Sequence, residues 1–310
     1  MEDKLQIFSP PQPLKIAVLF LVFNRLDTTK QVFEAIQKAK PPKLYIAADG
    51  ARNNMEGESE KIKAVRDFIL NNINWQCEIK TLFREKNLGC KYAVSSAITW
   101  FFEQEEMGIV LEDDCLPTQS FFWFCEELLH RYKDDMRVWH IGGTNFQNGF
   151  RRGDGDYYFS KYNHVWGWAG WASRWKFYDV ELNNIKSTDF LDNTFERRQV
   201  RQNWHKTFQT VKEKKIDTWD YQWAFTIWAN KGLAILPNSN MISNIGFGID
   251  ATHTQGDSNA MKTHQLTIKN HPSQVILNNE ADDYTFKHHY ELKSFLERIV
   301  NKLKGYFYAM

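Results

Sequence analysis

The sequence lacks the features of a membrane-spanning or disulfide-linked protein. Its longest uninterrupted apolar run, residues 16–23, is too short to cross a bilayer, and no basic-then-apolar signal pattern opens the chain. Only four cysteines occur in 310 residues, and none follows a C-x-x-C spacing. We therefore expect reduced thiols in a cytoplasmic protein.

An excess of charge is also lacking, because 39 lysines and arginines balance 38 acidic residues and leave a net charge of +1. A chain with this balance has no general attraction for nucleic acid, and we expect none as a partner. Neither G-x-G-x-x-G nor G-x-x-x-x-G-K-[ST] occurs, which argues against a dinucleotide-binding fold or a P-loop.

The first part of the chain alternates between two periodicities. Apolar runs of strand length at 15–23, 43–48, 78–83 and 107–111 alternate with helical patterns after Asp27, at 58–72 and after Gly89. This alternation predicts a mostly parallel sheet with helices on both faces. Further on, 118–132, 196–213 and 219–230 are typical of helices, 137–142 and 233–236 of strands, and 143–156 of a polar loop.

Polar clusters stand where three of these strands end: Asn24-Arg25, residues 49–52, and Glu112-Asp113-Asp114. Ligands of parallel sheets bind outside the carboxyl ends of the strands, so we expect the clusters to share one crevice. Three adjacent carboxylates repel one another and favour a bound cation. Mn²⁺ or Mg²⁺, which bind carboxylate and phosphate oxygens, is the expected cofactor, and a nucleotide diphosphate the expected ligand. The alternative is a solvated turn that caps the next helix.

Aromatic residues are abundant, with twelve tryptophans, twelve tyrosines and 23 phenylalanines. Four tryptophans lie within 166–175, separated in part by Gly167 and Gly170. Two interpretations stay open for this segment. Either the rings line a pocket, since aromatic faces stack on sugars and bases, or they form an aromatic core.

With these residues in view, the chain resembles glycosyltransferases of the GT-A type, a Rossmann-like α/β fold that uses nucleotide-diphosphate sugars. It is most similar to the inverting N-acetylglucosaminyltransferase that initiates complex N-glycans, and to its bacterial relatives. The resemblance covers residues 15–256 and implies a mixed, mostly parallel sheet. It implies transfer of a sugar, from a UDP-sugar in the first place, to a hydroxyl of a glycan or glycolipid acceptor.

The resemblance also assigns roles to individual residues. Asp114 is the expected metal ligand, with His253 as a looser match for a metal or phosphate contact, and Asp220 is the expected catalytic base. Trp166, Trp168, Trp171 and Trp219 are expected around the acceptor. The nucleotide-sugar donor is expected to contact Asn24, Arg25, Asp49, Arg52, Asn87, Lys91, Glu112 and Asp113. The alternative for Asp220 is a plain helix cap.

The organisation expected from the sequence is a lead-in at 1–14, a glycosyltransferase domain at 15–260 and an extension at 261–310. Within the domain, 15–117 is the nucleotide-binding half and 118–260 the acceptor and catalytic half. A basic amphipathic pattern at 288–304 predicts either peripheral contact with an anionic membrane or packing against the domain.

Two other functions stay open beside a cytoplasmic enzyme of polysaccharide biosynthesis. A sugar-1-phosphate nucleotidyltransferase also uses a metal and a nucleotide, but it should carry a glycine-rich, basic phosphate loop, which residues 15–30 lack. A non-catalytic carbohydrate-binding protein would use the tryptophans and would leave the acidic triplet without a role. Acceptor specificity is expected in the loops 143–156 and 176–195.

Overall fold

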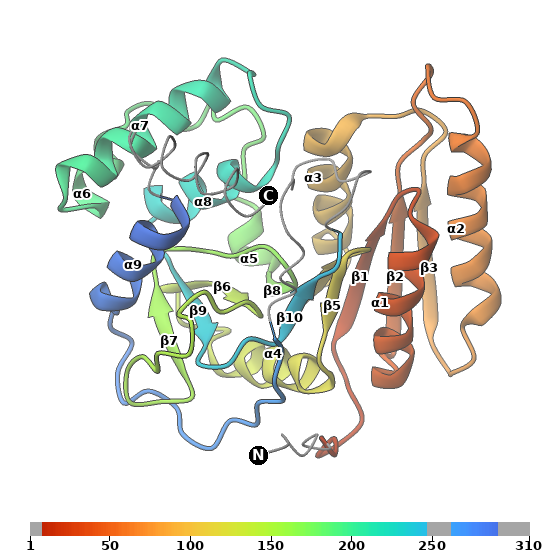
Figure 1. Ribbon diagram of the computed structural model, residues 1–310, viewed down its shortest axis with the longest axis horizontal. Coiled ribbons are helices and arrows are strands. Elements are labelled where there is room, and N and C mark those ends of the chain that lie inside the picture. Colours follow the sequence, from red (N-terminus) through yellow and green to blue (C-terminus); the bar gives the residue numbers. More distant parts are fainter. Residues whose placement is uncertain (1–7, 247–261, 291–310) are drawn as a thin grey trace, which may run out of the picture.

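A computed structural model describes residues 8–246 and 262–290. Its centre is an eight-stranded mixed sheet with helices on both faces (Figure 1). The strands are β1 (Ala17–Val22), β2 (Lys43–Ala48), β3 (Glu78–Phe83), β4 (Met107–Glu112), β5 (Cys115–Pro117), β6 (Val138–Gly142), β7 (Tyr157–Ser160), β8 (Trp168–Trp171), β9 (Leu233–Pro237) and β10 (Ile242–Asn244). The helices are α1 (Leu26–Ala39), α2 (Glu58–Asn72), α3 (Gly89–Phe102), α4 (Gln119–Arg131), α5 (Ala172–Trp175), α6 (Asp189–Thr194), α7 (Arg198–Lys212), α8 (Asp220–Ala229), α9 (Asn279–Thr285) and the π-helical turn η1 (Phe286–Tyr290).

The first four strands are parallel and run in the order β3-β2-β1-β4. Every residue of β1 is buried, as a continuous apolar strand covered on both faces requires. Val18 and Phe20 share a core cluster with residues of α1, α2 and α4, whereas Leu19 and Leu21 share another with residues of α3, α7 and α8. The strand period of two thus divides the helices between the two faces of the sheet.

The second half of the chain extends the same sheet in the order β8-β6-β9-β7. Strand β8 pairs antiparallel with both β4 and β6, and β9 runs parallel to β6. The tryptophan-rich segment therefore forms a strand inside the sheet, which the sequence analysis did not predict. Trp168 and Trp171 are each only 1% exposed, and they belong to the two opposite core clusters.

A short second sheet brings a late segment of the chain back to the acidic triplet. Strand β10 pairs antiparallel with β5, and Asn244 lies opposite Cys115, the residue after the triplet. The connection continues beyond β10 with a hydrogen bond from the Ile245 N–H to the Asp114 carbonyl oxygen at 2.8 Å. Residues 242–246 are thereby placed beside the end of β4.

The mostly parallel mixed sheet with helices on both faces is confirmed. The predicted bounds of β2, α2 and β3 agree with the structure, and those of β1, β4, β6 and α4 differ by one or two residues. The short elements β5, β7, β8, β10, α5, α6 and α9 were not predicted. The domain boundaries stay predictions, and the predicted amphipathic helix lies outside the described residues from residue 291 on.

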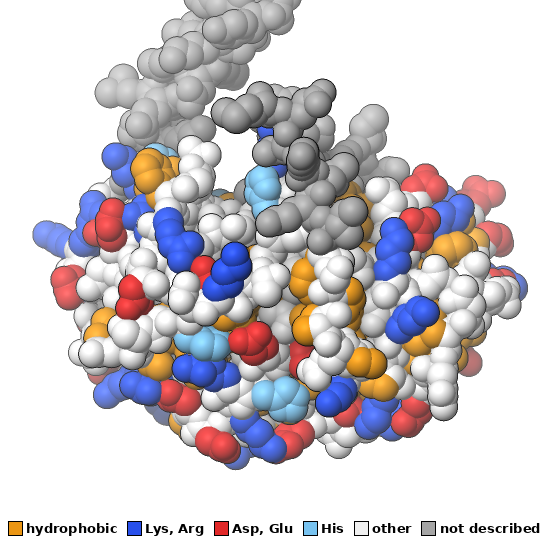
Figure 2. All heavy atoms as spheres, turned by 90° about the horizontal axis from the view of Figure 1, so that it is seen from below, with side chains coloured by type: hydrophobic (Ala, Val, Ile, Leu, Met, Phe, Trp, Pro, Cys, Tyr) orange, Lys and Arg blue, Asp and Glu red, His pale blue; other side chains and the backbone are white. Residues whose placement is uncertain are grey.

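The described residues contain no helix long and apolar enough to span a bilayer. On the face seen in Figure 2, basic and acidic side chains are interspersed. This mixture agrees with the near-neutral net charge of the whole chain.

Candidate functional site

The acidic triplet lies where β4 ends, next to the end of its parallel neighbour β1. The Arg25 guanidinium, three residues past β1, hydrogen-bonds Asp113 and, at 2.9 Å, Asp114 Oδ2. The Phe23 N–H donates to Asp113 Oδ2 at 3.3 Å. The structure thus brings together Arg25, Asp113 and Asp114, which the sequence analysis placed in one crevice.

Negative charge in the triplet exceeds what Arg25 compensates. Burial raises the pKa of Glu112 to about 8, and the charges of Asp114, Asp113 and Asp220 add to the shift. Burial likewise raises the pKa of Asp113 to about 6, although Arg25 opposes the change. Such shifts mark a position where a further cation is electrostatically favoured.

Asp220 comes from the second half of the chain, and its charge still reaches Glu112. It is the first residue of α8, and its Oδ1 accepts a hydrogen bond from Thr218. Burial raises the pKa of the Cys90 thiol, and Glu112, Asp217 and Asp220 add to this. Cys90, at the start of α3, therefore lies among acids from both halves of the chain, and no sequence motif indicated it.

A second polar cluster joins the ends of β1 and β2. Asn24 Nδ2 donates to Glu58 Oε1 at 2.9 Å, and the Arg52 N–H donates to Glu58 Oε2 at 2.7 Å. The Arg52 side chain also pairs with Glu58, and its hydrogen bonds lower the pKa of this carboxyl. Glu58 was missed in the sequence because it reads as an ordinary acid in the first turn of a helix.

Asp49 and Asn87 hold the connection that leads into α3. The Asp49 carboxylate accepts hydrogen bonds from the N–H groups of Leu88 and Gly89 at 2.9–3.1 Å. Asn87 Nδ2 donates to the Gly50 carbonyl oxygen at 2.8 Å. The donor contacts predicted for Asp49 and Asn87 stay predictions, and both residues also have a structural role at this turn.

Lys91 is paired away from the triplet. Its ammonium lies 3.0 Å from Glu181 Oε1, in a loop of the second half, and the residue is only 6% exposed. Its backbone N–H donates to Asp217 Oδ1 at 3.1 Å. A phosphate contact by Lys91 would require this ion pair to open.

Three of the four predicted acceptor tryptophans are core residues here. Trp168 and Trp219 stack on each other with ring centroids 6.1 Å apart, and Trp171 donates its ring N–H to the Leu129 carbonyl oxygen. All three are at most 3% exposed, which favours the aromatic-core interpretation for them. Trp166 is half-buried, and Phe146 packs edge-on against it.

Gly246 lies directly against the triplet and was not singled out from the sequence. A Cβ atom at this position would collide with Asp114 Oδ2 and Arg25 Nη1. Any larger residue at this position would therefore displace the side chains of Asp114 and Arg25. His253, predicted nearby, lies outside the described residues.

A metal site made by protein side chains alone is not present in the described part of the chain. No group of three or more His, Cys, Asp or Glu side chains is arranged there to hold an ion. Mg²⁺ and Mn²⁺ commonly bind to one or two carboxylates and complete their coordination with water and substrate phosphates. The hard oxygen donors of Asp114 and the incompletely compensated charge of the triplet fit such an ion.

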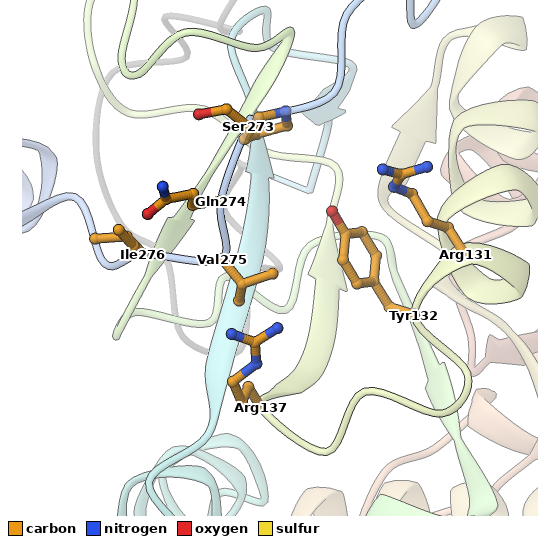
Figure 3. A pocket seen from close by; sticks show the side chains of 8 residues that line it. Arg131, Tyr132, Arg137, Ser273, Gln274, Val275 and Ile276 are labelled. Carbon is orange, nitrogen blue, oxygen red and sulfur yellow. The ribbon is translucent and has the colours of Figure 1, made fainter.

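Two pockets lie outside the triplet. One, of about 430 Å³, is formed by Arg131, Tyr132 and Arg137 on one side and residues 272–276 on the other (Figure 3). The second, of about 460 Å³, lies between the loop after α5, the start of α6 and the end of α8. Neither pocket includes a residue of the triplet, so both cavities are separate from the candidate site at the end of β4.

No protein-family model matches the chain, and no curated protein sequence matches it. Among solved structures, TarS of S. aureus (residues 1–349) is similar at 11% identity and a TM-score of 0.41, covering 74% of this chain and 59% of that one. The glycosyltransferase GlyE of Streptococcus pneumoniae is similar at 10% identity and a TM-score of 0.35, covering 71% and 45%. A UDP-glucose pyrophosphorylase bound to UDP-glucose gives 10% and 0.29, covering 52% and 78%.

This chain thus spans less than two thirds of the TarS and GlyE chains that it matches. At these identities and TM-scores, the similarities assign neither a family nor an activity to it. Its function has to be inferred from its own residues.

Arg25→Met should lower the free energy of unfolding by about 3 kcal/mol, the lower end for breaking a buried ion pair, because Arg25 is partly exposed. The substitution leaves Asp113 and Asp114 facing each other without their shared cation. Urea unfolding measures the loss. Arg137→Met, which removes an exposed pair with Asp135, is the control and should cost at most about 1 kcal/mol. Equal losses in both variants would contradict the role given to Arg25.

Glu112→Gln should flatten the pH dependence of stability. An acid whose pKa is raised from 4.5 to about 8 in the folded protein contributes stability below pH 4.5 that is lost as the pH rises through 8. In chelator, the melting temperature of the wild type should therefore fall more steeply between pH 5 and 8 than that of the variant. Glu106→Gln, at an exposed ion pair with Lys133, should behave like the wild type. Parallel curves for all three proteins would refute the raised pKa of Glu112.

Proposed function

We propose that the chain is a metal-dependent, inverting glycosyltransferase that moves a sugar from a nucleotide-diphosphate donor to a hydroxyl of a glycan or glycolipid. The proposal is carried by one observation: Arg25 lies against the triplet at the carboxyl ends of β1 and β4, and the charge of Asp220 also acts on Glu112. The residues that follow β1 and β4 offer charge for a diphosphate and a metal, and the start of α8 offers a base. A UDP-sugar is the preferred donor, and polysaccharide assembly in the cytoplasm the expected setting.

Asp114 is the residue best suited to hold Mn²⁺ or Mg²⁺. Its Oδ2 accepts from Arg25, whereas its Oδ1 accepts only a long contact from the Cys115 thiol at 3.4 Å among the described residues. A metal bound there would neutralise negative charge on the departing nucleotide diphosphate. Arg25, and Arg52 with its half-exposed guanidinium, add positive charge on the side of β1 and β2.

Asp49 can still serve a uracil base. Its two oxygens offer about four acceptor positions, and the N–H groups of Leu88 and Gly89 fill only part of them. The imide N–H of uracil fits a remaining position. Thymine presents the same imide edge, so this contact suits a uridine donor but does not by itself distinguish it from a thymidine donor.

Asp220 is the proposed general base. In an inverting transfer, the acceptor hydroxyl gives its proton to a carboxylate while its oxygen forms the new bond to the anomeric carbon. The bond from that carbon to the diphosphate breaks, and the nucleotide diphosphate leaves with the electron pair. Only Thr218 bonds the Asp220 side chain among the described residues, through Oδ1, which leaves Oδ2 to take the proton.

Asp114→Asn should weaken metal-dependent nucleotide binding. Thermal shift and calorimetry with UDP, dTDP, GDP and CDP, each with Mn²⁺ or with chelator, measure the effect. We expect the wild type to be stabilised by a uridine nucleotide only when Mn²⁺ is present, and the variant to lose at least about tenfold in affinity. The exposed Asp134→Asn is the matched control. Nucleotide binding that persists in chelator would refute the metal, and failure of every nucleotide to bind would refute the proposed function.

Asp220→Asn should keep donor affinity and lower kcat by at least about a hundredfold, the low end of general-base effects. Steady-state transfer assays and calorimetry on the same preparation separate the two quantities. Asp283→Asn, at an exposed acid of α9, should leave both unchanged. Near-normal turnover of Asp220→Asn would place the base elsewhere.

A further inference from the structure

The pocket of about 460 Å³ beside α8 has the chemistry of a carbohydrate site. It is lined by Phe177, a residue that is 43% exposed and whose ring packs against Trp139 with centroids 5.5 Å apart, and by Lys176, Asn184, Lys186 and Asn230. Ligand pockets of this size typically combine an apolar or aromatic wall with a few polar groups. An exposed ring beside amide and ammonium donors suits a sugar, which presents an apolar ring face and hydroxyl groups.

Polar groups of this pocket have capacity left for a ligand. Among the described residues, none forms a hydrogen bond or ion pair with the side chains of Asn184 and Lys186. Lys176 lies over the Phe177 ring at 5.2 Å, so a sugar that stacks on this face of the ring has to displace the Lys176 ammonium. By contrast, the pocket of Figure 3 is lined by Arg137, which is paired with Asp135, and by Tyr132, whose ring is buried. The pocket beside α8 is therefore the better saccharide site.

The loop that carries this pocket is held in place by its own contacts. Asp179 accepts hydrogen bonds from the N–H groups of Glu181 and Asn184 at 3.0 and 2.7 Å. Leu182 is buried with a positive φ of 55°, and Lys212 donates to its carbonyl oxygen at 2.9 Å. Asn184 is thereby positioned before any ligand arrives, which lowers the entropic cost of binding.

The same loop also touches the segment that carries Asp220. The Tyr178 hydroxyl, next to Phe177 in the chain, donates to the Trp219 carbonyl oxygen at 3.1 Å. Thr226, on the pocket wall, lies six residues after Asp220 in α8, which is about 9 Å along a helix axis. The pocket is thus too far away for the reacting hydroxyl. Because residues 222–228 of α8 are buried, an acceptor that fills the pocket has to reach Asp220 around this helix and not along it.

We propose that this pocket is a remote subsite that binds a saccharide unit of the acceptor glycan, with Phe177 stacking on the ring and Asn184 bonding its hydroxyls. The assignment rests on the proposed function, because it takes Asp220 as the end at which transfer occurs. It explains how the 176–195 loop selects an acceptor without contributing a group to the reaction itself.

Direct binding of tetrasaccharides tests the subsite without any need for turnover. Calorimetry and NMR titration of the full chain use cellotetraose, maltotetraose, chitotetraose and tetragalacturonate at millimolar concentration. We expect at least one of them to bind, with a Kd raised about tenfold or more by Phe177→Ala and by Asn184→Ala. Phe177→Tyr keeps an aromatic face and should retain binding, and Leu70→Ala, at an exposed apolar residue of α2, should leave the Kd unchanged.

The outcomes separate this subsite from the proposed function. Metal-dependent nucleotide binding should be the same in the wild type and in all four variants, which also reports on their folding. If nucleotides bind but no tetrasaccharide does, or if Phe177→Ala and Asn184→Ala leave the Kd unchanged, the subsite is refuted and the transferase stands. If tetrasaccharides bind in this pocket but no nucleotide binds, the proposed function fails and a carbohydrate-binding protein remains. Should Phe177→Ala fail to fold, Asn184→Ala and Phe177→Tyr decide.

Discussion

The pairing of Arg25 with Asp113 and Asp114 is the interaction on which the candidate site depends. Three consecutive carboxylates at the end of a buried strand repel one another, and burial makes each charge costly. Arg25 stands three residues past the neighbouring parallel strand, so the register of β1 and β4 delivers its charge to the acids. The compensation is incomplete, and this imbalance is the electrostatic basis of the proposed metal and diphosphate site.

The second half of the chain contributes by completing the sheet and not by forming a separate layer. Strand β8 joins β4 to β6, and its tryptophans fill both faces of the core. The helix that begins at Asp220 packs in the same cluster as Trp168, through Trp223 and Phe225. The proposed base is therefore fixed relative to the triplet by aromatic packing, and the loop 176–187 is fixed by its contacts to the same helix segment.

Several polar residues near the candidate site already have structural partners. Asp49 holds the start of α3, Glu58 joins Asn24 to Arg52, and Glu181 pairs with Lys91. Buried polar groups need such partners, because an unpaired one costs the free energy of its desolvation. A ligand that uses Lys91 has to replace an ion pair. Among the described residues, Asp114 Oδ1 accepts only from the Cys115 thiol, and no hydrogen bond reaches Asp220 Oδ2.

The sequence alone was enough to predict the alternating strands and helices of the first half and the meeting of Arg25 with the acidic triplet. Both follow from local periodicity and from the rule that the carboxyl ends of parallel strands lie on the same side of the sheet. It did not determine that residues 168–171 form a strand, because a four-residue run of tryptophan, alanine and glycine has no distinctive period. Only in the folded chain are three tryptophans buried, Gly246 and Cys90 placed beside the acids, and Lys91 paired with Glu181. These are contacts between residues far apart in the chain, and the packing of whole elements, which no local pattern encodes, brings them together.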